Sequence, residues 1–275
     1  MLDEMVLTVP PRPRRRGQAD APAEAAERRR LEQDLRQAVQ QENFTLLYQP
    51  RFCLRTGAAV GCEALVRWPH RRRGLVSPAA FIPLAEQSGL ITRIGGFVLR
   101  SACQEAAGWK RGIVSVNVSA RQLADQALLG QVATALEGSG LAPERLELEL
   151  TESMLLDVDT DALLCLSALR DRGVGLALDD FGTGYASLGM LKRLPLSTMK
   201  LDRSLVRTLP DEPEDVAIVR AAVQTGHALG LNVVGEGVEL ETQHDFLAAI
   251  GCDEAQGYLL ARPMPAEEAR ARLDG

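Results

Sequence analysis

The sequence predicts an α/β fold, a TIM-like (β/α)8 barrel with one antiparallel strand near the N-terminus. First, eight short apolar runs alternate with helical patterns, which is typical of a parallel sheet covered by helices. Second, about 240 residues carry these elements, close to the usual size of such a barrel. Third, only about eight residues, 51–58, join the first two runs, whereas a parallel crossover needs a dozen or more. The first connection is therefore predicted to be a hairpin.

The predicted strands are short apolar runs, and most of them end at a polar residue. The clearest is 175–181, whose nearly continuous apolar part lies between Gly173 and Gly182 and fits a strand covered on both faces. The turn of the first hairpin contains Arg55, Thr56 and Gly57, a plausible turn sequence. The predicted strands are 45–50, 59–68, 114–119, 146–151, 175–181, 198–202, 231–236 and 255–260.

Between most of these strands, apolar residues recur at helical spacing. The first two helices after the hairpin follow each other directly and are joined around Ser88 and Gly89. The predicted helices are 81–89, 91–109, 122–136, 161–172, 214–229 and 239–250.

The N-terminal segment differs in composition from the rest of the chain. Prolines at positions 10, 11, 13 and 22 prevent a continuous helix, and arginines at 12, 14, 15 and 16 form a basic cluster. We expect residues 1–30 to be a disordered tail or linker that could bind an unidentified protein partner, and residues 31–275 to form the folded domain. Residues 25–41 also have the pattern of a charged amphipathic helix, with Leu31, Leu35 and Val39 as its apolar positions.

Composition argues against several classes of protein. With 31 basic and 37 acidic residues the net charge is −6, which disfavours binding to a nucleic acid polymer. No apolar run is long enough to span a membrane. The five cysteines are scattered and lack a C-x-x-C motif, which indicates a reducing, cytoplasmic location. The three histidines are far apart, so carboxylates and amides would hold any metal, which favours Mg²⁺ or Mn²⁺.

Two adjacent aspartates, Asp179 and Asp180, end the strand 175–181 and lead into a loop with Gly182 and Gly184. Neighbouring carboxylates oppose each other's ionisation unless positive charge compensates them. A pair of divalent metal ions would supply that charge. The alternative is that the two aspartates cap a helix or face solvent in a turn.

Polar residues also end most of the other strands. Because the carboxyl ends of the strands of such a barrel meet at the face where chemistry occurs, these side chains should surround one site. Glu63 adds a carboxylate from the apolar middle of the second strand. The residues at the strand ends are Asn117, Glu149, Asp179, Asp180, Lys200, Asp202, Glu236 and Gln256.

Eight short motifs occur in a fixed order along the chain. They are Tyr48-Gln49-Pro50, Glu63-Ala64-Leu65-Val66-Arg67-Trp68, Asn117-Val118-Ser119-Ala120-Arg121, Glu149-Leu150-Thr151-Glu152-Ser153, Asp179-Asp180-Phe181-Gly182-Thr183-Gly184-Tyr185, Lys200-Leu201-Asp202-Arg203, Glu236-Gly237-Val238-Glu239 and Gln256-Gly257-Tyr258. With these motifs the chain from about residue 33 to 273 resembles the EAL-domain cyclic di-GMP phosphodiesterases. A lone E-A-L tripeptide carries no weight, but the ordered series is specific.

The resemblance implies hydrolysis of cyclic di-GMP to linear pGpG by a water that two Mg²⁺ or Mn²⁺ ions activate. The metal ligands that it implies are Glu63, Asn117, Glu149, Asp179, Asp180 and Glu236, with Asp179 shared between the ions. The catalytic residues that it implies are Glu63, Lys200 and Glu236, of which the last two position the water. Residues implied to contact the substrate or line its pocket are Gln49, Arg67, Glu239 and Gln256. Glu152 is expected to stabilise the loop 181–187.

Other functions on the same fold are a non-catalytic receptor for cyclic di-GMP and a protein-interaction module. The receptor alternative usually requires lost metal ligands, and none is lost here. Two departures from the family pattern are Gly235, where alanine is usual, and Ala186, where serine is common. Because members of the family often dimerise through the helix near the Asp-Asp loop, the resemblance also implies a homodimer.

Overall fold

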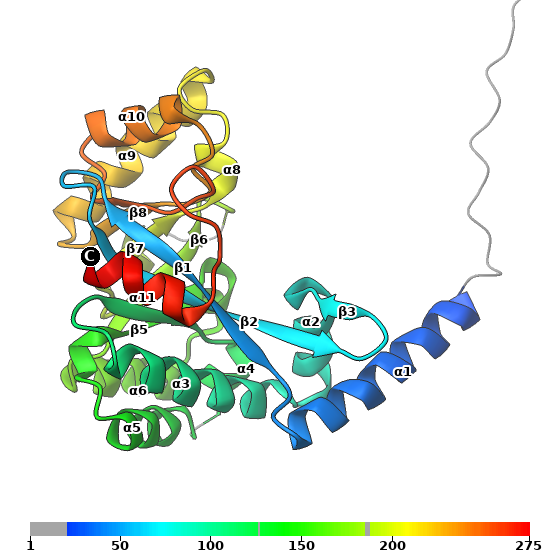
Figure 1. Cartoon of the computed structure of the whole chain (residues 1–275). Helices are drawn as coiled ribbons and strands as arrows, with labels where there is room; N and C mark the ends of the chain where they lie inside the picture. Colours follow the sequence, from blue (N-terminus) through cyan, green and yellow to red (C-terminus); the bar gives the residue numbers. More distant parts are fainter. Residues whose placement is uncertain (1–20, 126, 185–187) are drawn as a thin grey trace, which may run out of the picture.

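Eight strands close into a barrel in the computed structural model, which describes residues 21–125, 127–184 and 188–275 (Figure 1). Neighbouring strands are hydrogen-bonded in the order β1-β9-β8-β7-β6-β5-β4-β2, and β1 pairs with β2 to complete the circle. The strands are β1 (Thr45–Cys53), β2 (Ala59–His70), β4 (Ile113–Asn117), β5 (Leu146–Thr151), β6 (Gly175–Phe181), β7 (Thr198–Leu201), β8 (Asn232–Gly235) and β9 (Glu254–Ala255). The predicted barrel is confirmed.

The predicted antiparallel strand is β1. It runs antiparallel to both of its neighbours, β2 and β9, whereas the other neighbouring strands of the barrel are parallel. In the tight turn after β1, Cys53 and Ala58 are joined by a backbone hydrogen bond of 2.9 Å. Gly57 adopts a φ of 69° there, a left-handed conformation that glycine accepts without steric cost.

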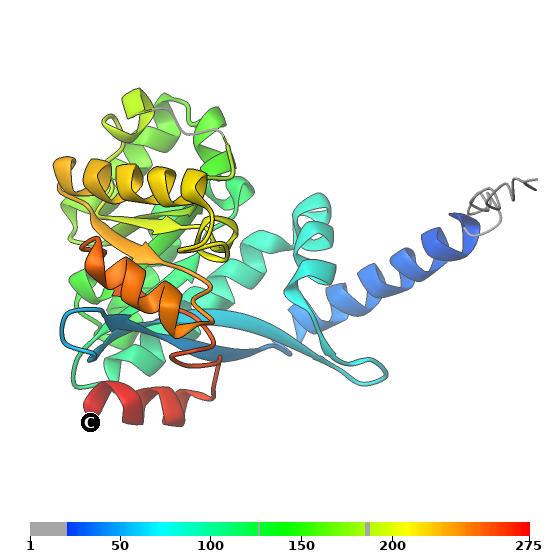
Figure 2. The same ribbon diagram turned by 90° about the horizontal axis from the view of Figure 1, so that it is seen from above.

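Helices cover the outside of the barrel (Figures 1 and 2). The longer helices are α2 (Pro78–Ser88), α3 (Ile91–Ala107), α5 (Leu128–Ser139), α6 (Thr160–Asp171), α9 (Pro213–Ala228), α10 (Glu241–Ala249) and α11 (Ala266–Asp274). The short helical turns are α4 (Ala120–Leu123), α7 (Leu188–Leu191), α8 (Arg203–Val206) and the 3₁₀ turns Pro143–Arg145 and Glu152–Asp157.

Several predicted elements are wrong in extent. The predicted helix 122–136 is two helices, α4 and α5, and the unpredicted α11 follows the last strand. The predicted strand 255–260 is reduced to the two residues of β9. At Gly257 the chain packs so closely on the backbone of Val238 that a Cβ atom would lie 2.1 Å from its carbonyl oxygen. The chain therefore leaves the sheet after β9, although its sequence remains apolar.

The helix α1 (Ala21–Gln40) projects from the barrel beside a hairpin formed by the end of β2 and the unpredicted β3 (Gly74–Val76) (Figures 1 and 2). Its C-terminal part is anchored by Leu35 and Val39 in the core, and Asp34 lies 3.1 Å from the ring of His70. The helix begins inside the range predicted to be a tail, of which residues 1–20 lie outside the described residues. The boundary at residue 30 therefore stays a prediction.

The barrel interior contains a buried ionic network. Arg51 of β1 is 1% exposed and lies 2.6 Å from Glu147 of β5 and 3.3 Å from Glu254 of β9. Glu147 also accepts hydrogen bonds from the hydroxyls of Ser115, at 2.8 Å, and Thr198, at 2.6 Å. Five strands, β1, β4, β5, β7 and β9, are thereby joined through Arg51 and Glu147. A buried charge is tolerated only where it is paired and hydrogen-bonded in this way.

Replacing Arg51 by methionine should lower the unfolding free energy by about 3–5 kcal/mol, because Glu147 would remain buried without its cation. The measurement is chemical denaturation followed by circular dichroism.

The matched control is Arg36→Met, which removes an exposed ion pair of the same length, 2.6 Å, between Arg36 and Glu32. It should cost less than about 1 kcal/mol because solvent screens an exposed pair. Equal losses in the two variants would contradict the assignment of a stabilising role to the buried network.

Candidate active site

Polar side chains form two successive layers inside the barrel. Alternate residues of a strand share a face, so Glu149 of β5 points inward like Glu147, and Lys200 of β7 points inward like Thr198. Lys200 and Glu149 contact each other at 2.8 Å, as Thr198 and Glu147 do at 2.6 Å in the layer below. The upper layer lies nearer the carboxyl ends of the strands, where barrel enzymes carry their active sites.

Lys200 is the centre of the upper layer and is completely buried. Its Nζ atom lies 2.7 Å from Glu236, 2.8 Å from Glu149, 3.2 Å from Asp179 and 3.8 Å from Glu63. Carboxylates that are far apart in the sequence thus converge on one ammonium group.

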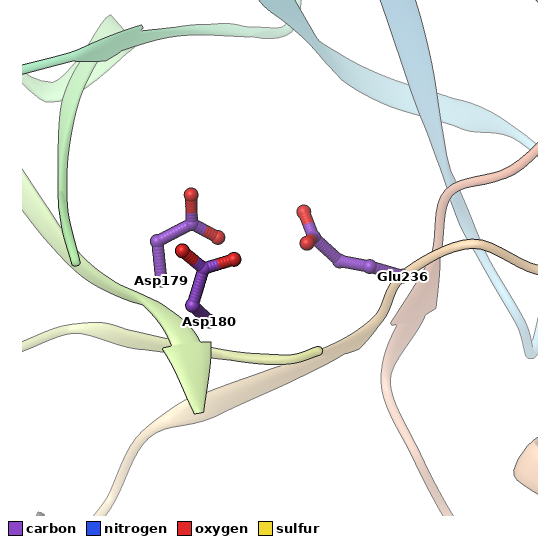
Figure 3. Close-up of side chains that lie close together, drawn as sticks. All are labelled: Asp179, Asp180 and Glu236. Carbon is purple, nitrogen blue, oxygen red and sulfur yellow. The ribbon is translucent and has the colours of Figure 1, made fainter. Parts of the chain in front are cut away.

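Asp179 and Asp180 both face this centre, although adjacent strand residues normally point to opposite faces. The reason is local. Asp180 has a φ of 57°, in the left-handed region that aspartate tolerates better than most residues, and the pairing of β6 with β7 shifts register between Leu178 and Phe181. The two carboxylates consequently point toward Glu236 on the opposite side of the site (Figure 3). One oxygen from each of the three residues lies within 4.8 Å of the others.

Glu63 of β2 is held by two amide donors. Asn117, at the end of β4, donates to Oε1 at 2.7 Å, and Gln256, just after β9, donates to Oε2 at 2.8 Å. These contacts bring three of the predicted site residues together and fix the orientation of the Glu63 carboxylate.

The loop after β6 is attached to Glu152, the residue that follows β5. Its Oε2 atom accepts hydrogen bonds from the backbone N–H groups of Gly182 at 3.0 Å, Thr183 at 3.2 Å and Gly184 at 3.4 Å. Tyr185 and Ala186 lie outside the described residues.

The site has an excess of negative charge. Burial alone would lower the pKa of Lys200, but the carboxylates around it, Glu149 foremost, raise it well above the usual value, so the amine carries its charge. Burial would likewise raise the pKa of Glu63, but Lys200 and the two amide donors hold it below the usual value.

Three further carboxyls, those of Glu149, Glu236 and Asp180, have raised pKa values. Burial and then the neighbouring Glu63 raise the pKa of Glu149 well above the usual value. Burial is also the main cause for Glu236, whose pKa rises to about 8, and for Asp180, whose pKa is raised further by Asp179. One ammonium therefore does not compensate all five carboxylates.

A cavity of about 350 Å³ opens directly above this centre. Glu63, Asp180 and Glu236 form part of its wall, and the predicted substrate residues Gln49, Glu239 and Gln256 also line it. Arg67 does not line this cavity. It lies beside Asn117 on the wall of a separate, mainly apolar cavity of about 470 Å³ under α2 and α3.

Several residues that line the central cavity are not among those predicted from the sequence. They are Arg203, Arg207, Gly237, Gln243, Gly257 and Tyr258. Some of them occur inside the quoted motifs, but no local signal marks them as site residues. They reach the cavity only through the packing of α8, of α10 and of the loops after β8 and β9.

These residues fit a pair of divalent cations. Apart from the ion pairs with Lys200, both oxygens of Glu149 and Oδ1 of Asp179 are buried with no hydrogen-bond donor in the described part of the chain. Five carboxylates around one ammonium leave four formal negative charges, which two divalent cations would offset. Carboxylate and amide oxygens are also the ligands that Mg²⁺, Mn²⁺ and Ca²⁺ prefer.

Oxygen ligands around a cavity at the carboxyl face of a barrel are typical of a metal-dependent barrel enzyme. Comparison with known proteins assigns the family. The sequence profile of the EAL domain matches residues 32–263, and the chain belongs to the EAL domain family.

Two curated relatives come from Pseudomonas aeruginosa. The bifunctional diguanylate cyclase/cyclic di-GMP phosphodiesterase MucR is 45% identical over 256 residues, which cover 91% of this chain and 37% of MucR. The cyclic di-GMP phosphodiesterase NbdA is 42% identical over 246 residues, which cover 88% of this chain and 31% of NbdA. The chain thus spans about a third of the length of these relatives.

Solved structures share the fold. The PaMucR phosphodiesterase in complex with c-di-GMP aligns with a TM-score of 0.83 at 45% identity, over 87% of this chain and 99% of that chain. The EAL enzyme Bd1971, in a form that binds cAMP and cyclic di-GMP, aligns with a TM-score of 0.86 at 30% identity, over 91% of this chain and 70% of that chain. Within the described residues, no helix combines the length and the apolar character that a membrane crossing requires.

Binding of Mn²⁺ should stabilise the protein more at about pH 8.5 than at about pH 6, because cation binding must displace the protons that Glu149 and Glu236 retain. The metal-free protein should itself lose stability as the pH rises from about 4.5 through about 8, because a carboxyl whose pKa is raised by folding binds more protons in the folded state. Both effects are measured as melting temperatures, with and without Mn²⁺, after dialysis against a chelator.

Glu236→Gln is the control variant, and it should reduce the pH dependence of the metal-free protein. Stabilisation by Mn²⁺ that is equal at both pH values, or larger at the lower one, would contradict the predicted displacement of protons.

Proposed function

We propose that this EAL domain hydrolyses cyclic di-GMP to linear pGpG with two Mg²⁺ or Mn²⁺ ions per active site. The observation that carries the proposal is the convergence of five carboxylates and one buried ammonium beneath a cavity at the carboxyl face of the barrel. The names of MucR and NbdA, and the cyclic di-GMP in the PaMucR structure, support the substrate.

Glu63, Asn117, Glu149 and Asp179 would hold one cation, and Asp179 and Asp180 the second, with Glu236 beside both. When bound, the cations supply Lewis-acid activation of the phosphodiester and of the attacking water. The hydrogen bonds from Asn117 and Gln256 orient Glu63 for this task, since a ligand whose direction is fixed binds a cation with less loss of entropy.

Lys200 would orient the attacking water and stabilise negative charge on the phosphoryl oxygens. Its raised pKa keeps it charged, so it donates hydrogen bonds and does not act as a base. Glu236, 2.7 Å from Lys200, offers an acceptor oxygen at the edge of the cavity and would orient the same water. Glu152 would keep the loop after β6 in place through its bonds to the backbone.

Gln49, Glu239 and Gln256 would contact the substrate in the central cavity. Gln49 is held in place by a hydrogen bond of 3.1 Å to the carbonyl of Ala261. Arg67 would contact a part of the substrate that extends beyond the central cavity, because it lines the neighbouring cavity beside Asn117. A non-catalytic receptor or an interaction module would not need the complete set of carboxylates that this site retains.

Incubation of the purified protein with cyclic di-GMP and Mn²⁺ should yield pGpG, detected by chromatography, and a chelator should abolish the product. Asp179→Asn and Glu63→Ala should each lower turnover by at least about a thousandfold, because each removes a cation ligand whose loss costs several kcal/mol of transition-state stabilisation.

Asp171→Asn, an exposed aspartate in the last turn of α6, is the matched control and should keep full turnover. Circular dichroism checks that each variant is folded. Tight binding without product would support the receptor, and neither binding nor product would support the interaction module. Full turnover in either site variant would refute the site assignment.

The same proposal places the reaction in the cytoplasm, which the five free cysteines support. It also includes a homodimer formed near the loop after β6. Leu164 of α6 and Leu188 of α7, the helices before and after β6 in the chain, are 62% and 63% exposed. Light scattering should give twice the mass of the chain, and Leu164→Glu together with Leu188→Glu should give the mass of one chain, since charge opposes burial of these positions.

The control for the dimer is Leu75→Glu, a leucine that is 58% exposed and belongs to β3, in the hairpin beside α1. It should leave the measured mass unchanged. A wild-type mass of a single chain at the concentrations used for turnover would contradict the dimer.

A further inference from the structure

Arg203, the first residue of α8, and Arg207, the residue directly after it, line the central cavity that contains Asp180 and Glu236. They are four residues apart, so their side chains lie on one side of the helical turn. Both are exposed, and within residues 21–125, 127–184 and 188–275 neither has a carboxylate within 4.0 Å. Neither guanidinium donates a hydrogen bond to another described residue. They are unpaired cations on the wall of an otherwise acidic cavity.

The position of α8 is fixed by the two loops that carry the acidic site. A Cβ atom at Gly182, after β6, would lie 2.3 Å from Leu205, and one at Gly237, after β8, would lie 2.4 Å from Arg203. Gly237 has a φ of 66°, which also favours glycine. Residues of α8 therefore pack directly against the segments that follow Asp180 and Glu236.

Two further contacts fix the ends of α8. The Asp202 carboxylate accepts from the backbone N–H of Ser204 at 2.9 Å, and the side-chain amide of Gln243 donates to the carbonyl of Arg207 at 3.1 Å. The arginine side chains are exposed, but they start from a backbone that these contacts hold in place, as a site for an anionic ligand requires.

A cyclic dinucleotide has two phosphodiester anions, and only one can face the acidic centre with its cations. The second needs a separate positive charge, because the other residues of the cavity wall that ionise as acids, Asp202 and Glu239, would repel it. Guanidinium groups suit this task, since they bind phosphate oxygens through two parallel hydrogen bonds.

We propose that Arg203 and Arg207 bind the phosphate that is not hydrolysed and so select diesters with a second anionic phosphate. This inference rests on the proposed phosphodiesterase function. If the two arginines only offset the charge of the nearby acidic side chains, the effect of replacing them would not depend on the substrate.

The test compares cyclic di-GMP, which has two phosphates, with bis(p-nitrophenyl) phosphate, which has one, both in the presence of Mn²⁺. Arg203→Gln and Arg207→Gln should each raise KM for cyclic di-GMP by about tenfold with little change in kcat, because each loses hydrogen bonds to a charged group. The loss of kcat/KM for bis(p-nitrophenyl) phosphate should be at least about fivefold smaller.

Arg203→Lys and Arg207→Lys should restore part of the affinity, because lysine keeps the charge but not the paired hydrogen bonds. The matched control is Arg170→Gln, an exposed arginine of α6 that lies outside the cavity, and it should change neither substrate's kinetics. Arg203→Gln and Arg207→Gln should also lower the dependence of KM for cyclic di-GMP on salt concentration, since each variant loses one ionic contact.

Equal losses for both substrates, or a fall in kcat with KM unchanged, would overturn the proposed role of the two arginines while leaving the phosphodiesterase function in place. Failure of the wild-type protein to hydrolyse either diester would instead refute the phosphodiesterase function, and the inference with it.

Discussion

The site depends on the ion pairs between Lys200 and the carboxylates around it. The ammonium is completely buried and contacts carboxylates from β5, β6, the end of β8 and, at 3.8 Å, β2. Without it, side chains from opposite sides of the barrel would repel one another in a region with little solvent to screen them. With it they still retain excess negative charge, as the raised pKa values of Glu149 and Glu236 indicate. The same arrangement therefore holds the barrel face together and leaves a net negative charge beside the cavity.

Similar residues have different roles in the two polar layers inside the barrel. In the lower layer, Glu147 is surrounded by donors from Arg51, Ser115 and Thr198, so its charge is satisfied. In the upper layer, Glu149 has only the ion pair with Lys200, and a cavity lies above it. A satisfied buried network stabilises the fold, whereas an unsatisfied one next to a cavity is a place where a ligand can bind.

Much of the fold could be predicted because its signals are local. Strand and helix patterns located most elements, and the length of one connection was enough to identify β1 as antiparallel. Errors arose where packing overrides propensity. The apolar run after β9 does not continue as a strand, because Gly257 packs on the backbone of Val238. Among the site residues, those that end strands were found, while Arg203 and Arg207 were not, because a helical turn brings them to the cavity.

By itself the sequence determined the family, the barrel and the side chains that point into it, since the alternation of a strand fixes the direction of each residue. Only the tertiary structure decided how these groups meet. The left-handed backbone of Asp180 turns two adjacent carboxylates to one side, and the close packing of Gly182 and Gly237 places α8 against the same cavity. Distances between residues far apart in the chain depend on strand register and on steric contact between segments, and neither is encoded in any local pattern.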